Sequence, residues 1–222
     1  MEYSLKGKAF DYIKQNIINC VYMPNTILSE AELISEMDIS RTPIREALCK
    51  LEQEGLIQIL PKRGIIVKDI SISEVSMIFE ERLRTEPYII KNYIQNIDRA
   101  SLEAIYLQLT PELLDDKHFI KLYSIDHLLH SIINEACPNP YITKHMEHVL
   151  NQSNRLRIIA GSNIHQRQTP TTTEHLQLID SLLHKSTANS VELMEEHLIN
   201  SRDAAIRSLI NADISAKFLN SY

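Results

Sequence analysis

The sequence contains little glycine and little cysteine. Glycine occurs 4 times in 222 residues, and only Gly161 follows residue 64. Because β-type alternation of apolar residues is also absent beyond about residue 70, that part of the chain is predicted to be helical almost throughout. The three cysteines, Cys20, Cys49 and Cys137, are odd in number, far apart and not in a Cys-x-x-Cys pair. This usage excludes a disulfide framework and is typical of a reducing cytoplasm.

Long apolar runs are missing as well. No stretch approaches the roughly 20 apolar residues that a membrane-spanning helix requires. The N-terminus lacks the basic segment and apolar core of a signal peptide. Hydrophobic residues make up 44% and charged residues 23% of the chain, which is ordinary for a globular protein. We therefore expect a cytoplasmic protein of one large or two small domains with no membrane partner.

An excess of positive charge is absent too, since the formal net charge is −6. The first 70 residues hold 9 Lys/Arg and 10 Asp/Glu, and the remainder holds 14 and 19. Any binding to nucleic acid must therefore come from a local cluster of cations rather than from bulk charge. The histidines, in contrast, are strongly partitioned, because all nine lie beyond residue 117.

One local cluster of cations lies in the segment Ser40–Leu48, which has the features of a helix start. Thr42 is the expected N-cap, and Pro43 would then be the first helical residue. Arg41 and Arg45 lie off the apolar stripe of this helix. That stripe consists of Ile44, Leu48 and Leu51. A short helix that is buried on one side and carries arginines at its N-terminus can enter a DNA major groove.

The residues before this helix predict a second helix at helix-turn-helix spacing. Ser29 and Glu32 form a capping-box pattern, and Asp38-Ile39 makes a tight connection into Ser40. Gly55 suits the left-handed conformation just past the end of the arginine-bearing helix.

A β-hairpin is predicted directly downstream. Leu56–Leu60 and Ile65–Val67 are β-prone, and Pro61-Lys62-Arg63-Gly64 between them has Pro and Gly placed for a turn. Such a wing would carry two cations within reach of phosphate or of the minor groove.

The remaining chain is divided by breaks such as Thr110-Pro111 and Pro138-Asn139-Pro140. These breaks predict helices near 74–97, 100–109, 112–136, 140–160, 172–186 and 190–211. Six helices joined by short loops predict an antiparallel bundle. The fold class is therefore mostly α, with a winged helix-turn-helix followed by an all-α bundle.

Polar residues interrupt the apolar faces of this bundle. Asp126 and His130 are at i and i+4, so they project side by side, and His175 and His197 lie on apolar faces of two later helices. Burial of an unpaired carboxylate is costly. The four residues are a plausible first shell for a divalent transition metal, with zinc favoured and nickel, manganese or iron compatible. The alternative is a buried polar network in which each histidine bonds to a neighbour.

Arg82 also lies on an otherwise apolar helical face. It could form an intrahelical pair with Glu86, or its guanidinium could bind an anionic ligand with two parallel hydrogen bonds. Arg155 and Arg157 are further candidates for the same ligand.

The motif from Leu28 to Gly64 resembles the winged helix of GntR-type bacterial transcription regulators. The matching positions are Leu28-Ser29-Glu30, the segment Ser40–Leu48, Leu51-x-x-Glu54-Gly55-Leu56 and Pro61-x-Arg63-Gly64. The resemblance implies that Arg41, Thr42 and Arg45 face DNA and that the wing touches the minor groove. The expected DNA-binding residues are Ser40, Arg41, Thr42, Pro43, Arg45, Lys62, Arg63 and Gly64. Ala31 departs from the family's fatty-acid-responsive member, which has an arginine there.

The helical part resembles the FCD domain, the effector domain of the FadR branch of GntR regulators. The resemblance rests on Asp126-x3-His130, His175 and His197 with their spacing, and on a few neighbouring motifs. Those motifs are Arg82-x3-Glu86-Pro87, Ala136-x-x-Asn139-Pro140, Glu174-His175 and Met194-x-x-His197-Leu198. It implies a metal held by Asp126, His130, His175 and His197, with positions open to water or to an effector carboxylate.

Two domains are expected: a DNA-binding domain over 1–70 and an FCD-like effector-binding and dimerisation domain over 71–222. The expected function is a ligand-responsive repressor that binds a palindromic operator as a homodimer. Its small carboxylate effector would contact Arg82 and Arg157. The alternative is a metalloenzyme fused to a DNA-binding module, because three histidines and an aspartate could activate water. No companion general base with a recognisable spacing accompanies them, so we expect no enzyme.

Overall fold

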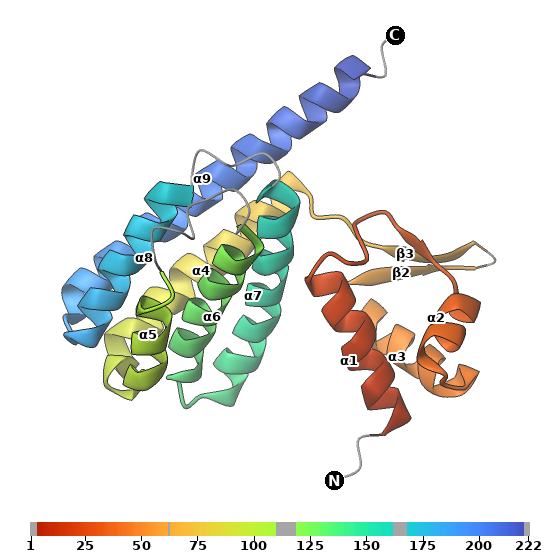
Figure 1. The fold of residues 1–222 in the computed structure, drawn as a ribbon, viewed down its shortest axis with the longest axis horizontal. Coiled ribbons are helices and arrows are strands. Elements are labelled where there is room, and N and C mark those ends of the chain that lie inside the picture. The colour runs from red at the N-terminus through yellow and green to blue at the C-terminus, as the bar shows by residue number, and fades with distance from the viewer. Residues whose placement is uncertain (1–3, 62, 110–118, 162–167, 220–222) are drawn as a thin grey trace. The chain divides into compact units, whose positions relative to one another are not determined.

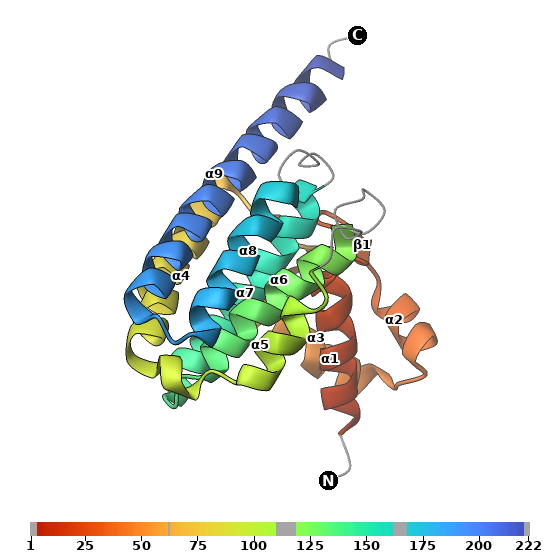
Figure 2. The ribbon, with the colours of Figure 1, turned by 60° about the vertical axis from the view of Figure 1, so that its left-hand side comes forward.

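The computed structural model describes residues 4–61, 63–109, 119–161 and 168–219. The chain divides into two compact units, Met1–Ser71 and Ile72–Tyr222. The first unit contains three helices and a small antiparallel sheet (Figures 1 and 2). Its helices are α1 (Leu5–Ile18), α2 (Glu30–Met37) and α3 (Arg41–Gln53). Its strands are β1 (Ile27–Leu28), β2 (Ile57–Leu60) and β3 (Gly64–Val67).

The helix-turn-helix is formed by α2 and α3. The predicted capping box is confirmed, because Ser29 accepts from the backbone N–H of Glu32 while Glu32 accepts from that of Ser29. Asp38, at φ +52°, turns the chain after α2 in the left-handed conformation.

The predicted start of α3 is wrong by two residues, since Ser40 is the N-cap and Pro43 is the third helical residue. The first turn of a helix leaves its N–H groups without intrahelical partners, so proline is tolerated at several positions there and does not mark the first one.

Gly55 ends α3 as expected. At φ +71°, it allows its own N–H to bond Glu52 O and the N–H of Leu56 to bond Leu51 O. This pair of bonds is a Schellman motif, which satisfies carbonyls at the helix end and turns the chain into β2.

The wing is the antiparallel β2–β3 hairpin, with Ile57 opposite Val67 and Leu60 opposite Gly64. Gly64 is the first residue of β3 rather than the last residue of the loop, and its φ is +105°. A side chain there would be strained by the backbone conformation, and its Cβ would lie 3.1 Å from Leu28 O, a tight contact. β1 completes the sheet on the other side of β3, and Lys62 lies outside the described residues.

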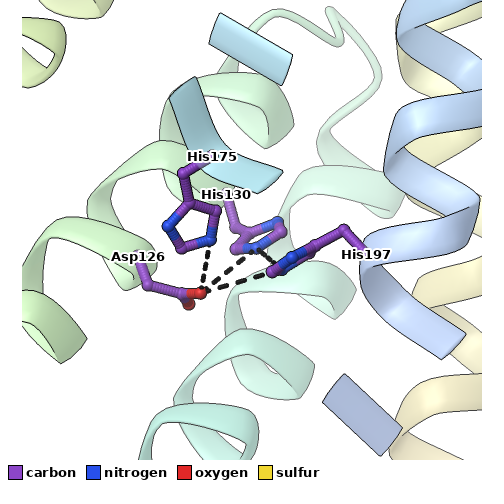
Figure 3. Close-up of side chains that lie close together, drawn as sticks. All are labelled: Asp126, His130, His175 and His197. Carbon is purple, nitrogen blue, oxygen red and sulfur yellow. Dashed lines mark hydrogen bonds and ion pairs between the residues drawn. The ribbon is translucent and has the colours of Figure 1, made fainter. Parts of the chain in front are cut away.

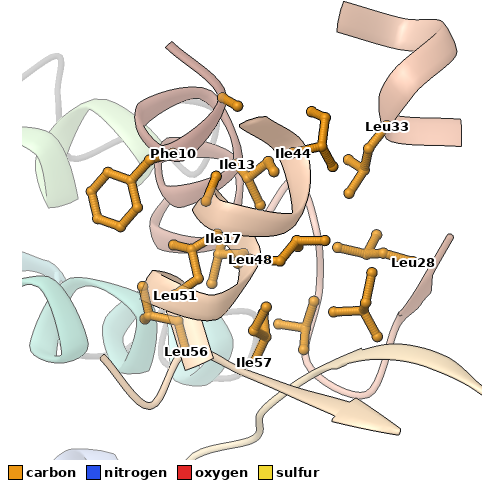
Figure 4. Close-up of a cluster of buried hydrophobic side chains, with 14 of the residues drawn as sticks. Phe10, Ile13, Ile17, Leu28, Leu33, Ile44, Leu48, Leu51, Leu56 and Ile57 are labelled. Carbon is orange, nitrogen blue, oxygen red and sulfur yellow. The ribbon is translucent and has the colours of Figure 1, made fainter. Parts of the chain in front are cut away.

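The core of the first unit lies between the three helices and the sheet (Figure 4). Ile44, Leu48 and Leu51 of α3 are buried in it, as their helical spacing predicted. Ile13 and Ile17 of α1 pack in the same cluster. The opposite side of α3, with its two arginines, therefore remains exposed.

The second unit is a helical bundle, as predicted (Figures 1 and 2). Its elements are α4 (Ile72–Tyr93), the 3₁₀ helix η1 (Ile94–Asn96), α5 (Arg99–Tyr106), α6 (Phe119–Glu135), α7 (Pro140–Gly161), α8 (Gln168–Leu183) and α9 (Thr187–Leu219). The long helix α4 packs against α6, α7 and α9, and α8 packs against α5 and α9. Within the described residues, no helix is long and apolar enough to span a membrane.

The helix boundaries in this unit depart from the predicted ones. α8 begins at Gln168 and continues through Pro170, and α9 extends to Leu219. Proline in the first turn of α8 again fails to mark a break, because the N–H that it lacks has no intrahelical partner there. The first part of the predicted helix 112–136 lies outside the described residues, and the described part begins at Phe119.

Candidate metal centre and nucleic-acid interface

Four buried side chains meet inside the bundle (Figure 3). Asp126 and His130 come from α6, His175 from α8 and His197 from α9. One ligand atom from each lies within 4.8 Å of all the others. The helical period explains the α6 pair, because residues four apart lie one above the other on the same face. Contacts of α8 and α9 with each other and with the rest of the bundle bring the two later histidines to this pair.

The distances suit a single metal ion. Asp126 Oδ1 lies 2.9 Å from His175 Nε2 and 3.8 Å from His130 Nε2 and His197 Nε2. The two ring nitrogens of His130 and His197 are 3.3 Å apart. Ligands bound to zinc at about 2.0–2.1 Å are separated by about 3.3–3.5 Å in a tetrahedron, a value that falls among those found here.

Two glutamates contact two of the three imidazoles on the side that faces away from the centre. Glu86 of α4 pairs with Nδ1 of His130, and Glu174 of α8 lies 2.9 Å from Nδ1 of His197. A carboxylate on Nδ1 places the proton there and leaves Nε2 as the lone pair that faces the centre. Sequence reasoning named Glu86 only as a possible partner of Arg82 and Glu174 only as part of the Glu174-His175 motif. A glutamate four residues from an arginine, or next to a histidine, is too common a pattern to identify such partners.

The protonation states fit ligand binding. Burial lowers the pKa of His197 to about 3 and also lowers the pKa of His130, so both imidazoles are neutral near pH 7. Burial alone would raise the pKa of Asp126, but the positive charge of Arg157 holds the pKa of this carboxyl well below its usual range. Both ring nitrogens of His175 are buried, and its Nε2 lies 2.9 Å from Asp126 Oδ1 without the geometry of a hydrogen bond. A buried polar network would align these two groups in a hydrogen bond, so the donor set fits a metal better.

Arg82 lies in the second layer around this centre. Its Nε is 2.7 Å from Glu86 Oε1, and its Nη1 donates to Ser153 Oγ of α7 at 2.8 Å. The intrahelical pair with Glu86, one of the two alternatives, is therefore present. Nη2 of Arg82 is buried and has no hydrogen-bond partner.

A cavity of about 70 Å³ adjoins the centre. Asp126 and Arg157 form its charged wall, and Nη2 of Arg157 pairs with Asp126 Oδ2. Nη1 of Arg157 is buried and makes no hydrogen bond. Arg82 does not line the cavity, but its partner Ser153 does. The other lining residues are Phe79, Leu122, Tyr123, Leu156, Ala160, Thr171, Ser201, Ala204 and Ala205.

The residues expected to contact DNA belong to two parts of the first unit, the start of α3 and the wing, and Lys62 of the wing lies outside the described residues. Ser40, Arg41, Thr42 and Arg45 are exposed at the start of α3, and Pro43 beside them is half-buried. Arg63 is exposed and Gly64 half-buried at the tip of the wing. Cations at a helix start and at a hairpin tip are the two contact points of a winged helix on DNA.

A winged helix-turn-helix joined to a helical bundle with a buried polar centre is the architecture of a transcription regulator. The family comparison agrees. The family model of bacterial regulatory proteins of the gntR family matches residues 5–67, and that of the FCD domain matches residues 77–200. The chain belongs to the GntR family of bacterial transcription regulators, in the group that carries an FCD domain.

Individual relatives give the same result. The HTH-type transcriptional repressor RspR of Escherichia coli K12 is 25% identical over 189 residues, which are 84% of this chain and 82% of RspR. E. coli McbR/YncC has the same fold, with a TM-score of 0.81 at 15% identity over 93% of this chain and 99% of its own. The Zn²⁺-bound FCD domain of TM0439 aligns with a TM-score of 0.53 at 21% identity, over 64% of this chain and 97% of its own. RspR is named as a transcriptional repressor and not as an enzyme, so the metalloenzyme alternative finds no support.

Proposed function

We propose that this regulator is a cytoplasmic, ligand-responsive repressor that binds a palindromic operator as a homodimer. The observation that carries the sensing part is the convergence of Asp126, His130, His175 and His197 beside a cavity with a charged wall. The proposed partners are double-stranded operator DNA, a small carboxylate effector and a second copy of the chain.

The DNA-binding part of the proposal rests on the exposed start of α3. Arg41 and Arg45 are the candidates for contacts with base edges, because arginine donates to guanine O6 and N7. Ser40, Thr42 and Pro43 would approach the DNA backbone beside these two arginines. Arg63 and Gly64, together with Lys62, would follow the minor groove or the phosphates. The proposed DNA-binding domain is 1–70, and 71–222 is the proposed effector-binding and dimerisation domain.

The sensing part of the proposal assigns a divalent metal to Asp126, His130, His175 and His197. Zinc suits three imidazoles and one carboxylate, and nickel, manganese and iron are also compatible. The FCD domain of TM0439, which this chain resembles, binds Zn²⁺. When bound, the ion supplies a Lewis-acidic position for a carboxylate oxygen. Arg157 would hold the other oxygen through its unpaired Nη1, because a charged N–H group makes a strong hydrogen bond to a carboxylate. Arg82 would support this contact indirectly, because it donates a hydrogen bond to Ser153, which lines the cavity.

Metal content tests the centre directly. Protein purified without a metal-binding tag is expected to carry about one ion per chain by elemental analysis. Asp126→Ala and His175→Ala should lose the ion. His145→Ala is the matched control, because His145 is exposed and pairs only with Glu81 at 3.3 Å among the described residues. Well under one ion per chain, with no gain on adding zinc, nickel or manganese, would remove the centre.

Release from DNA tests the function. The operator duplex is first selected from random DNA with the wild-type protein, and small carboxylic acids are then screened for relief of its binding. An acid that releases wild-type protein should fail with Arg157→Ala, whose metal content and DNA binding without acid stay at wild-type level. Turnover of the acid by the wild-type protein would instead favour the enzyme.

A further inference from the structure

Glu30 is the first residue of α2, and its carboxylate lies against the arginines at the start of α3. Both of its oxygens are 3.0 Å from Nε of Arg45, and Oε2 is 4.0 Å from Nε of Arg41. The contact occupies Nε of Arg45 and not its two terminal nitrogens. The Glu30 side chain is 33% exposed and that of Arg45 59% exposed, so the pair lies on the surface that carries the proposed DNA contacts.

We infer that Glu30 is a positioning residue that sets the sequence specificity of Arg45, an inference that rests on the proposed function. An arginine reads guanine with two parallel donors directed at O6 and N7. Anchoring Nε fixes the plane of the guanidinium and leaves Nη1 and Nη2 as that donor pair. A long side chain that is already oriented loses less conformational freedom when it binds.

A purely structural role explains the contact less well. The cap of α2 is made by Ser29 and Glu32 and does not require Glu30. Exposed ion pairs also contribute little to stability. The placement of one acid between two arginines that protrude from the start of α3 therefore has its main consequence for DNA.

The two effects of Glu30 on DNA binding have opposite signs, which makes them separable. As a negative charge near phosphates, Glu30 weakens binding to every duplex. As a positioning group, it strengthens binding only where Arg45 meets its base. The ratio of affinities for a selected and a scrambled duplex isolates the second effect, since the charge effect cancels in it.

The experiment uses the full chain, the operator duplex selected by the wild-type protein and a scrambled duplex of equal composition. Glu30→Ala should bind the scrambled duplex more tightly and lose specificity by about 5- to 10-fold, part of what one arginine–guanine contact provides. Glu30→Gln should retain part of the specificity, because its amide oxygen still accepts from Nε. In a double-mutant cycle, Arg45→Ala should remove any further effect of Glu30→Ala.

Glu46→Ala is the matched control. Glu46 lies on α3 with a side chain 51% exposed and pairs with Lys6 at 3.3 Å rather than with an arginine. Its removal deletes the same charge and should change both affinities equally. If Glu30→Ala also changes both equally while its melting temperature stays at the wild-type value, Glu30 is only a charge and the inference is overturned. If the wild-type protein selects no duplex, the proposed function itself fails.

Discussion

At the scale of single residues, Glu86 and Glu174 decide which nitrogen of a histidine is available at the centre. Each carboxylate faces an Nδ1, so His130 and His197 turn Nε2 toward Asp126. His175 has no such partner in the described part of the chain. The centre is therefore supported unequally, with two of its imidazoles fixed from behind.

Glu174→Gln should weaken metal binding by about 10- to 100-fold, the usual cost of removing a carboxylate behind a ligating histidine. The amide is neutral and a weaker acceptor, so it holds Nδ1–H of His197 less firmly. Competition with a chelating indicator dye measures the affinity. Glu196→Gln removes an exposed carboxylate next to His197 in the sequence and should leave the affinity unchanged. Equal affinities for both variants would show that Glu174 does not tune the centre.

At the scale of elements, α4 carries two arginines with contrasting surroundings. Arg82 and its partner Glu86 have side chains at most 1% exposed, whereas Arg84 and Glu80 are 70% and 56% exposed. Arg82→Met should lower the free energy of unfolding by about 3–5 kcal/mol, because it leaves the Glu86 carboxylate buried without its cation. Arg84→Met should change it by about 0.5 kcal/mol or less. Urea unfolding followed by circular dichroism measures both, and similar values for the two variants would contradict the bridging role of Arg82.

The joint between α1 and α2 should respond to acid. Glu36 of α2 accepts from the Tyr12 hydroxyl of α1 at 2.6 Å and from that of Tyr22 at 2.9 Å, and these bonds lower the pKa of Glu36 below 4.5. A carboxyl whose pKa is lower in the folded than in the unfolded state contributes stability to the folded state. This contribution is complete above the pKa of the unfolded state and is lost as pH falls through the pKa of the folded state. The stability difference between wild type and Glu36→Gln should therefore shrink below about pH 4.5. Thermal unfolding over pH 3–7 measures it, and a pH-independent difference would exclude this contribution.

The sequence predicted an element more accurately where apolar residues repeat over several turns than where the same residues are compatible with more than one position in a helix. The apolar period of α3 and the Ser29–Glu32 capping box were correct because they depend on neighbouring residues. β1 was missed, since two residues cannot show an alternation. Prolines 43 and 170 misplaced helix starts, because the first turn accepts proline at more than one position.

At the scale of the whole molecule, the centre ties α6, α8 and α9 together. Removing the metal with a chelator should lower the melting temperature of the helical bundle. Saturation at 100 times the dissociation constant provides about 2.7 kcal/mol. A change of that size corresponds to roughly 5–10 °C for a protein of this length. Calorimetry with and without chelator measures the shift, and Asp126→Ala should show none. A shift of equal size in that variant would place the metal elsewhere.

The convergence of the four residues at the centre was inferred from resemblance and from helical faces, and the structure brings them together. The layer behind them could not be derived from the sequence. Whether Arg82 faces a ligand or Glu86 depends on how α4, α6 and α7 pack, and helical spacing does not encode that packing. Glu30 beside Arg45 is similar, since the pair crosses the turn between two helices.

The order of the centre's residues along the chain has a consequence for protein synthesis. His197 is translated 67 residues after His130 and well after residue 71, where the first compact unit ends. At roughly 5–20 residues per second, the ribosome needs about 6–25 s to travel from residue 71 to residue 197. During that interval, the nascent chain contains the whole first unit but lacks at least one of the four residues of the centre. Messages interrupted between the codons for residues 71 and 197 would therefore yield polypeptides that contain the first unit and lack a complete centre.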